Sequence, residues 1–115
     1  MDERSDPSAH KAWLAGGGIA SLATAAYLIR EGRMPGHTIA ILEESTQIGG
    51  SLDAHGDPER GYVMRGGRMF DEEAYSCTFD LLSFIPSLND SGKSVMAEFR
   101  EFNETFRSHS RSRLV

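Results

Sequence analysis

Apolar and polar positions along the chain change their period several times, and each change predicts a new element. Residues 11–15 form a short apolar run that stops at a glycine cluster, which predicts a strand. From Ile19 to Ile29, apolar residues recur at helical spacing and predict a helix with one apolar face. The β-branched run His37–Glu43 is typical of a parallel strand buried on both faces. We therefore expect residues 11–43 to form the β-α-β unit that opens a doubly wound sheet.

A polar segment separates this unit from the next apolar run. Residues 44–60 are rich in Gly, Asp and Pro, so we interpret them as a loop, and Gly61–Arg65 as a short strand. Asp53, Asp57 and Glu59 do not fit the calcium-loop pattern, and we interpret them as solvated loop acids.

Two more helices are expected after Gly66 and Gly67. One is predicted to begin at Asp71 as its N-cap and to run to Ile85, where Pro86 stops it. Another is predicted from Ser94, as its cap, to about Phe106. Both carry apolar stripes, so we expect buried faces there. Cys77 on the first helix, and Phe99, Phe102 and Phe106 on the second, are expected to lie on them.

The glycine cluster after the first strand fits the spacing G-x-G-x-x-G, with serine at the third position. Gly16 permits a sharp turn, and Gly18 leaves no Cβ between the backbone and a pyrophosphate group. The phosphates would then lie on the N–H groups at the start of the helix. Ser21 affects how closely that helix packs on the strand. The alternative is a glycine-rich structural turn that binds nothing.

Two features downstream favour a dinucleotide, and FAD over NAD. Glu43 follows the second strand about twenty residues after the turn, where a carboxylate binds ribose hydroxyls and disfavours a 2′-phosphate. Gly49, Gly50 and Ser51 resemble the second nucleotide-contacting turn of many flavoproteins. Farther on, Arg65–Arg68 pairs two glycines with two arginines, and two interpretations stay open. The segment either approaches a flavin and an anionic group, or forms a strand-to-helix turn with surface arginines.

Length and composition narrow the classes of protein. A chain of 115 residues is short for an FAD enzyme, so we expect a truncated FAD-binding domain over 11–115. The polar residues 1–10 before it are expected to form a disordered tail. A net charge of −5 does not favour nucleic acid as a partner. One cysteine, no signal peptide and no apolar run of membrane-spanning length predict a cytoplasmic protein. The four histidines lack metal-ligand spacing, so no metal site is predicted.

Several short segments, occurring together and in order, closely resemble the N-terminal region of the oleate hydratases, also called myosin-cross-reactive antigens. They are 15–22, 26–30, 34–36, 41–43, 49–53, 56–59, 61–63, 65–68 and 85–88. The resemblance implies an FAD-dependent lyase that adds water to the cis-9 double bond of oleate and gives 10-hydroxystearate, without net redox change. It also implies that the flavin is held by Gly16, Gly18, Ser21, Glu43, Gly50 and Ser51. The segment comprising Arg65, Gly66, Gly67 and Arg68 would approach the flavin ring and the double bond.

The sequence departs from the family pattern at one position. Many members have a glutamate directly after this segment, assigned to the attacking water, and this chain has Met69. A thioether is a weak acceptor and takes no proton, so Met69 is expected to pack at the flavin edge, and no catalytic residue is assigned. Two alternatives remain: a flavin oxidoreductase of the amine oxidase or desaturase type, and a truncated product without catalytic activity.

Overall fold

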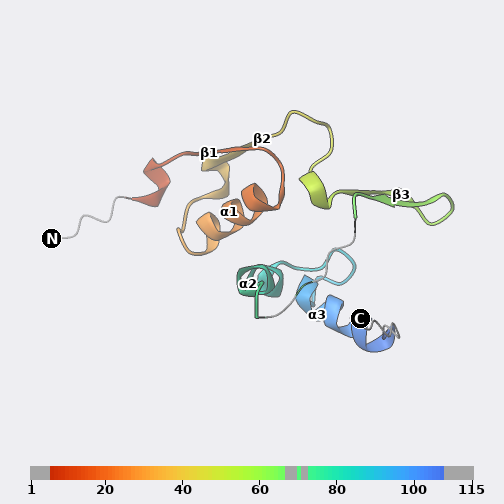
Figure 1. Cartoon of the computed structure of the whole chain (residues 1–115). Helices are drawn as coiled ribbons and strands as arrows, with labels where there is room; N and C mark the ends of the chain where they lie inside the picture. The colour runs from red at the N-terminus through yellow and green to blue at the C-terminus, as the bar shows by residue number, and fades with distance from the viewer. Residues whose placement is uncertain (1–5, 67–69, 71–72, 108–115) are drawn as a thin grey trace. The chain divides into compact units, whose positions relative to one another are not determined.

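The computed structural model describes residues 6–66, 70 and 73–107 of the chain (Figure 1). Contacts divide the chain into two units, Met1–Met69 and Phe70–Val115. The expected tail contains a short 3-10 helix, η1 (Pro7–Ala9). Asp6 caps this helix, because its carboxylate accepts a hydrogen bond from the backbone N–H of Ser8 at 3.0 Å.

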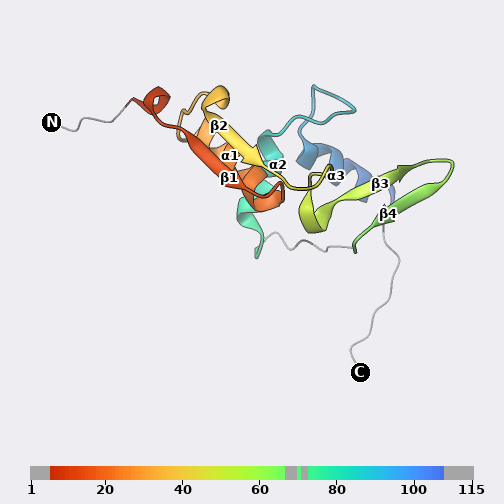
Figure 2. The ribbon, with the colours of Figure 1, turned by 90° about the horizontal axis from the view of Figure 1, so that it is seen from above.

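The first unit begins with the parallel β-α-β motif that the sequence predicts. Strand β1 (Ala12–Ala15) leads into helix α1 (Ile19–Arg30), a short 3-10 helix η2 (Gly36–Thr38) and strand β2 (Ile39–Leu42). The two strands pair in parallel and α1 packs on both of them (Figure 2). The glycine turn, residues 16–18, connects the carboxyl end of β1 directly to the start of α1.

Burial of this motif is lower than the apolar pattern of its strands predicts. Trp13 on β1 is 68% exposed and Leu42 on β2 is 54% exposed, so the expectation of a strand buried on both faces was wrong here. The physical reason is the size of the sheet, since within the described residues β1 and β2 pair only with each other. One helix covers part of one face, and the apolar side chains on the strands remain accessible.

An antiparallel hairpin stands where residues 44–60 were expected to form a loop. The 3-10 helix η3 (Gly50–Leu52) is followed by β3 (Ala54–Asp57) and β4 (Gly61–Met64). The predicted strand β4 is confirmed, while β3 was missed because its sequence carries no apolar alternation. The Asp57 carboxylate closes the turn by accepting the backbone N–H groups of Glu59 and Arg60 at 2.9 and 2.8 Å.

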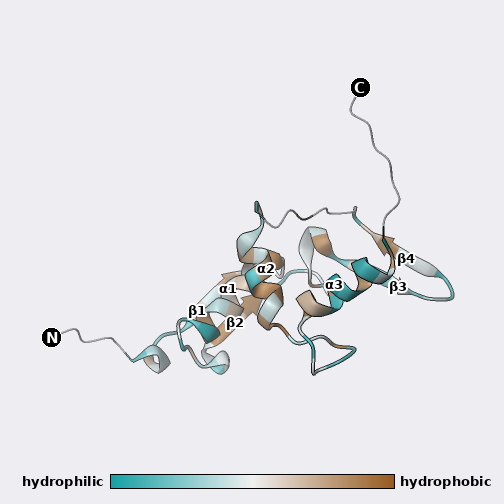
Figure 3. Cartoon of the chain, turned by 90° about the horizontal axis from the view of Figure 1, so that it is seen from below, coloured by the Kyte–Doolittle hydropathy of each residue, from teal (hydrophilic) through white to brown (hydrophobic). Residues whose placement is uncertain are grey.

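The second unit contains helices α2 (Ser76–Phe84) and α3 (Val95–Thr105), which pack on each other. The cap of α3 is confirmed, since the Ser94 hydroxyl accepts the N–H of Ala97 at 3.1 Å. The predicted start of α2 was wrong: the helix begins after Tyr75, and the proposed cap Asp71 lies outside the described residues. Hydrophobic and hydrophilic residues share the surface of α3 (Figure 3).

The core between α2 and α3 is small. Leu81 and Met96 are 6% and 5% exposed, and the buried Ser87 hydroxyl donates to Glu98 at 2.6 Å. The expected buried stripes were wrong in detail, because Cys77 on α2 is exposed. Phe99 and Phe102 on α3 and Phe106 at its C-cap are exposed as well. Periodicity identified an apolar face of α3, but the core contact of that helix is Met96.

Candidate cofactor site

The glycine turn after β1 is open on the side where a ligand would approach. Gly16 has φ +87°, and a Cβ built there would meet no atom within 4 Å. Its backbone N–H still donates to Leu42 O at 2.6 Å, which continues the pairing of β1 with β2. Helix α1 begins after Gly18, and no side chain caps it. The first-turn N–H groups of α1 therefore have no side-chain acceptor from the cap residue, which is the condition under which a helix start can bind an anion.

Ser21 lies at the position of the third fingerprint glycine and links the helix to the strand. Its hydroxyl donates to the carbonyl oxygen of Ala15, at the end of β1, over 3.2 Å. A glycine at this position would allow only close packing of α1 on β1, whereas the serine adds a hydrogen bond between the helix and the strand. This placement agrees with the packing role that the sequence predicts for Ser21.

The turn at Gly49 and Gly50 lies directly against the first glycine turn, although 31 residues separate Gly18 from Gly49 along the chain. The N–H of Gly49 donates to Gly17 O at 2.8 Å, and Gly49 pairs with Gly18 as an isolated parallel bridge. A Cβ at Gly50 would lie 3.1 Å from Gly18 Cα, so the two backbones approach closely. Ser51 follows in η3 and is exposed. The structure thus brings both predicted nucleotide-contacting turns into one cluster.

Glu43 contacts the same cluster through its carboxylate. Oε2 accepts the N–H of Gly17 at 2.5 Å, and Oε1 accepts the N–H of Ser45 at 2.9 Å. The hydrogen bond from Ser45, followed by that from Gly17, holds the pKa of Glu43 below its ordinary value. Glu43 is therefore ionised at neutral pH and ties the end of β2 to the glycine turn. The sequence predicted the position of this carboxylate but not its contact with Gly17.

This arrangement predicts a pH dependence of the glycine turn. Because the pKa of Glu43 is lowered on folding, its stabilising effect is complete above the ordinary value of 4.5 and is lost as the pH falls through the lowered value. The amide proton resonances of Gly17 and Ser45 should shift upfield together in that acid range, as followed by an NMR titration. Glu43→Gln should reproduce the shift of at least one of them at neutral pH, and a flat titration would contradict the assignment.

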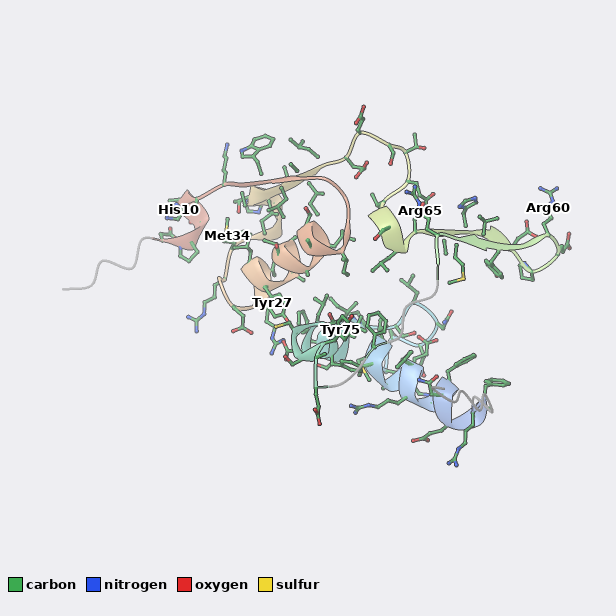
Figure 4. All side chains as sticks on the ribbon, viewed as in Figure 1. His10, Tyr27, Met34, Arg60, Arg65 and Tyr75 are labelled. Atoms are coloured by element: carbon green, nitrogen blue, oxygen red, sulfur yellow. The ribbon has the colours of Figure 1, made fainter. Side chains whose placement is uncertain are left out.

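Arg65 stands at the end of β4 and forms an ion pair that the sequence did not indicate. Its Nε lies 2.7 Å from Asp53 Oδ1, and the Asp53 side chain is 8% exposed. The interpretation of Asp53 as a solvated loop acid was therefore wrong. Figure 4 shows Arg65 at the η3 end of the hairpin and Arg60 at its tip. Gly66 follows with φ +146°.

The remaining members of the predicted site fall outside what can be described. Gly67, Arg68 and Met69 lie outside the described residues, so their contacts with a flavin stay predictions. The described residues contain no group of three or more metal-ligating side chains. None of the described helices has the length and apolar character that crossing a membrane requires.

An open hollow of about 460 Å³ lies on the second unit, between Phe70, Phe79 and one side of α3. Its walls combine apolar rings with charged side chains, namely Arg100 and Glu104 on α3 and Arg107 just after that helix. The exposed Phe99 belongs to this lining. Sequence periodicity did not identify the hollow, because it arises where α3 passes the residues around α2.

Fold and site together define an α/β protein whose first unit is a parallel β-α-β motif built around paired glycine turns. Residues 9–115 match the model of the MCRA family, and the chain belongs to this family. The oleate hydratase of Streptococcus pyogenes serotype M49 (strain NZ131) is 40% identical over 90% of this chain and 18% of its own length. The linoleate hydratase of Lactiplantibacillus plantarum is 30% identical over 91% of this chain and 21% of its own length. The chain thus spans about a fifth of these relatives.

Proposed function

We propose that this chain is the FAD-binding N-terminal segment of a fatty acid hydratase. The complete enzyme would add water to the cis-9 double bond of oleate and form 10-hydroxystearate. Membership of the MCRA family and the likeness to an oleate hydratase and a linoleate hydratase support the reaction class. The observation that carries the proposal is the hydrogen bond from Gly49 N–H to Gly17 O, which joins the two glycine turns.

The residues present fit a dinucleotide. Gly16 leaves open space beside the turn, and α1 begins without a side-chain cap, so its first N–H groups suit the pyrophosphate. A carboxylate has about four lone-pair sites, and the described contacts of Glu43 include two backbone N–H donors, from Gly17 and Ser45. Glu43 would therefore hold the turn and accept ribose hydroxyls at the same time. When bound, FAD would supply an isoalloxazine ring beside the reacting alkene.

The attacking water needs a group other than Met69. A thioether neither accepts a proton nor orients a water firmly, so residue 69 would contribute apolar contact. Acidic residues are common at the start of a helix, where they cap it. Because α2 begins after Tyr75, capping of that helix does not account for the acidic residues 71–73. These acids, together with groups from the rest of the enzyme, are candidates for orienting the water.

The proposal is tested with the full-length protein that carries this segment. Purified protein should bind FAD and, incubated anaerobically with oleate in ¹⁸O-labelled water, should form 10-hydroxystearate that carries the label. The flavin absorption spectrum should remain that of the oxidised form, because hydration transfers no net electrons.

Other results of the same incubation would contradict the proposal. Bleaching of the flavin in proportion to product would indicate an oxidoreductase of the amine oxidase or desaturase type. Absence of FAD binding would remove the cofactor assignment. Bound FAD without a labelled hydroxy fatty acid would remove the hydratase assignment while leaving the cofactor site intact.

A further inference from the structure

We propose that Asp53 is a positioning residue for FAD binding, which holds Arg65 and the end of β4 against the second glycine turn. This inference rests on the proposed function, because it concerns the same cofactor site. Its basis is a chain of contacts that runs from the first glycine turn to Arg65.

The first contact joins the two turns. Gly49 N–H donates to Gly17 O at 2.8 Å, so movement of the second turn moves the backbone beside the pyrophosphate position. Gly49 in turn packs tightly on Asp53: a Cβ at Gly49 would lie 3.2 Å from Asp53 Cα and 3.3 Å from Asp53 Cβ. The helix η3 between them is closed by the N–H of Asp53, which donates to Gly50 O at 3.3 Å. Asp53 is therefore fixed relative to the turn.

The second contact is the ion pair with Arg65. In the hairpin register Ala54 pairs with Met64, so the next position outward sets Asp53 opposite Arg65. Such a facing pair of opposite charges joins the two strands. The pair is asymmetric, because the Asp53 side chain is 8% exposed and that of Arg65 is 66% exposed.

Because the Asp53 carboxylate is buried, we expect its ion pair with Arg65 to be needed for the structure of this segment. Ion pairs between two exposed side chains contribute little, whereas a buried charge without its partner is strongly unfavourable. Asp53 Oδ1 is buried and makes no well-aligned hydrogen bond within the described part of the chain, so the guanidinium 2.7 Å away compensates its charge as an ion pair. Loss of either charge should therefore displace the segment 49–53 and the end of β4 together.

The test measures FAD affinity of the full-length protein by flavin fluorescence, with Asp53→Asn, Arg65→Gln and the double variant. Each single variant should weaken binding about tenfold, and the double variant should be no weaker than the worse single one, because the two residues act through each other. Arg65→Lys keeps the charge, and because the contact described is a single Nε–Oδ1 pair and not a bidentate one, this variant should stay within about threefold of the wild type. In the apoprotein, amide exchange at Leu52 and Asp53 should become faster when Arg65 is replaced.

Asp57→Asn is the matched control, because it removes an acid from the same hairpin. The Asp57 carboxylate accepts hydrogen bonds only from the turn backbone at residues 59 and 60 among the contacts described. It should lower the stability of the hairpin without changing FAD affinity. An FAD affinity of Arg65→Gln equal to that of the wild type would overturn the positioning role, and so would a double variant in which the two single losses multiply.

If Asp53→Asn does not fold, the comparison of Arg65→Gln with Arg65→Lys still tests the positioning role, since Arg65 is mostly exposed. A wild-type protein that binds no FAD would instead refute the proposed function.

Discussion

Gly18→Ala is expected to lower the affinity for FAD on the order of a hundredfold while leaving the fold in place. Gly18 has φ −80° and ψ 176°, which alanine adopts readily, and a Cβ there would come no closer than 4.0 Å to Gly50 Cα. The new methyl group therefore makes one ordinary van der Waals contact and overlaps no protein atom. In the proposed site it would occupy the space through which the pyrophosphate approaches the backbone, so the cost would fall on binding.

The measurement is FAD titration of the full-length variant, together with its thermal unfolding. Unfolding should change little, because alanine is a worse N-cap than glycine by about 0.5–1 kcal/mol, which is a small part of the stability of a full-length protein. Gly36→Ala is the matched control, since a Cβ there would make an ordinary contact with Ile29 Cδ1 at 3.7 Å. Unchanged FAD affinity in Gly18→Ala would mean that the pyrophosphate does not bind at this turn.

Gly56→Ala is expected to break the β3–β4 hairpin. Gly56 has φ +139°, and a Cβ there would lie 2.1 Å from Gly61 O and 2.8 Å from Tyr62 Cα. Both atoms belong to the paired strand, so relief of the overlap requires separation of the strands. Overlap and backbone strain together should cost about 3–5 kcal/mol, which exceeds what a two-stranded hairpin can lose.

Amide hydrogen exchange over residues 54–64 measures this effect, and Gly61→Ala separates strain from overlap. Gly61 also has a positive φ, of +84°, but a Cβ there would meet no atom within 4 Å. Gly61→Ala should therefore cost about 1–2 kcal/mol of hairpin stability from backbone strain alone. Equal exchange rates in the two variants would show that the overlap at Gly56 is relieved without opening the hairpin.

The elements that were predicted correctly carry their signals within a few neighbouring residues. Helix α1 follows a glycine turn and has an apolar period, and α3 begins at Ser94, whose hydroxyl caps it. The parallel pairing of β1 with β2 was also predictable from the sequence. Parallel strands need a crossover connection, and the helix between the two apolar runs supplies one. Local chemistry was sufficient in these cases.

The features that the sequence did not indicate depend on partners far along the chain. Strand β3 has little strand propensity of its own and exists through its pairing with β4. Once that register is known, Asp53 falls opposite Arg65, but no local spacing shows it. Without the hairpin, Asp53 resembles the solvated acids around it.

Burial was the least predictable property. Helical spacing identified an apolar face that includes Phe99, Phe102 and Phe106, but spacing does not show whether a partner covers that face. Cys77 was expected to be buried for the same reason and is exposed. In the candidate site, the positions of Gly18 and Glu43 followed from the fingerprint. The hydrogen bond between Glu43 and Gly17 N–H did not, because it depends on how β2 ends.

Because Trp13 is exposed, its fluorescence can report on β1 and on the glycine turn that follows it. It is the only tryptophan in the sequence and stands on β1, a few residues before the glycine turn. An indole that is 68% exposed to water emits at long wavelength, and any protein surface that covers β1 would move the emission to shorter wavelength. A flavin held at the turn would also accept excitation energy from the indole. Fluorescence of one side chain thus reports both coverage of the sheet and occupancy of the turn.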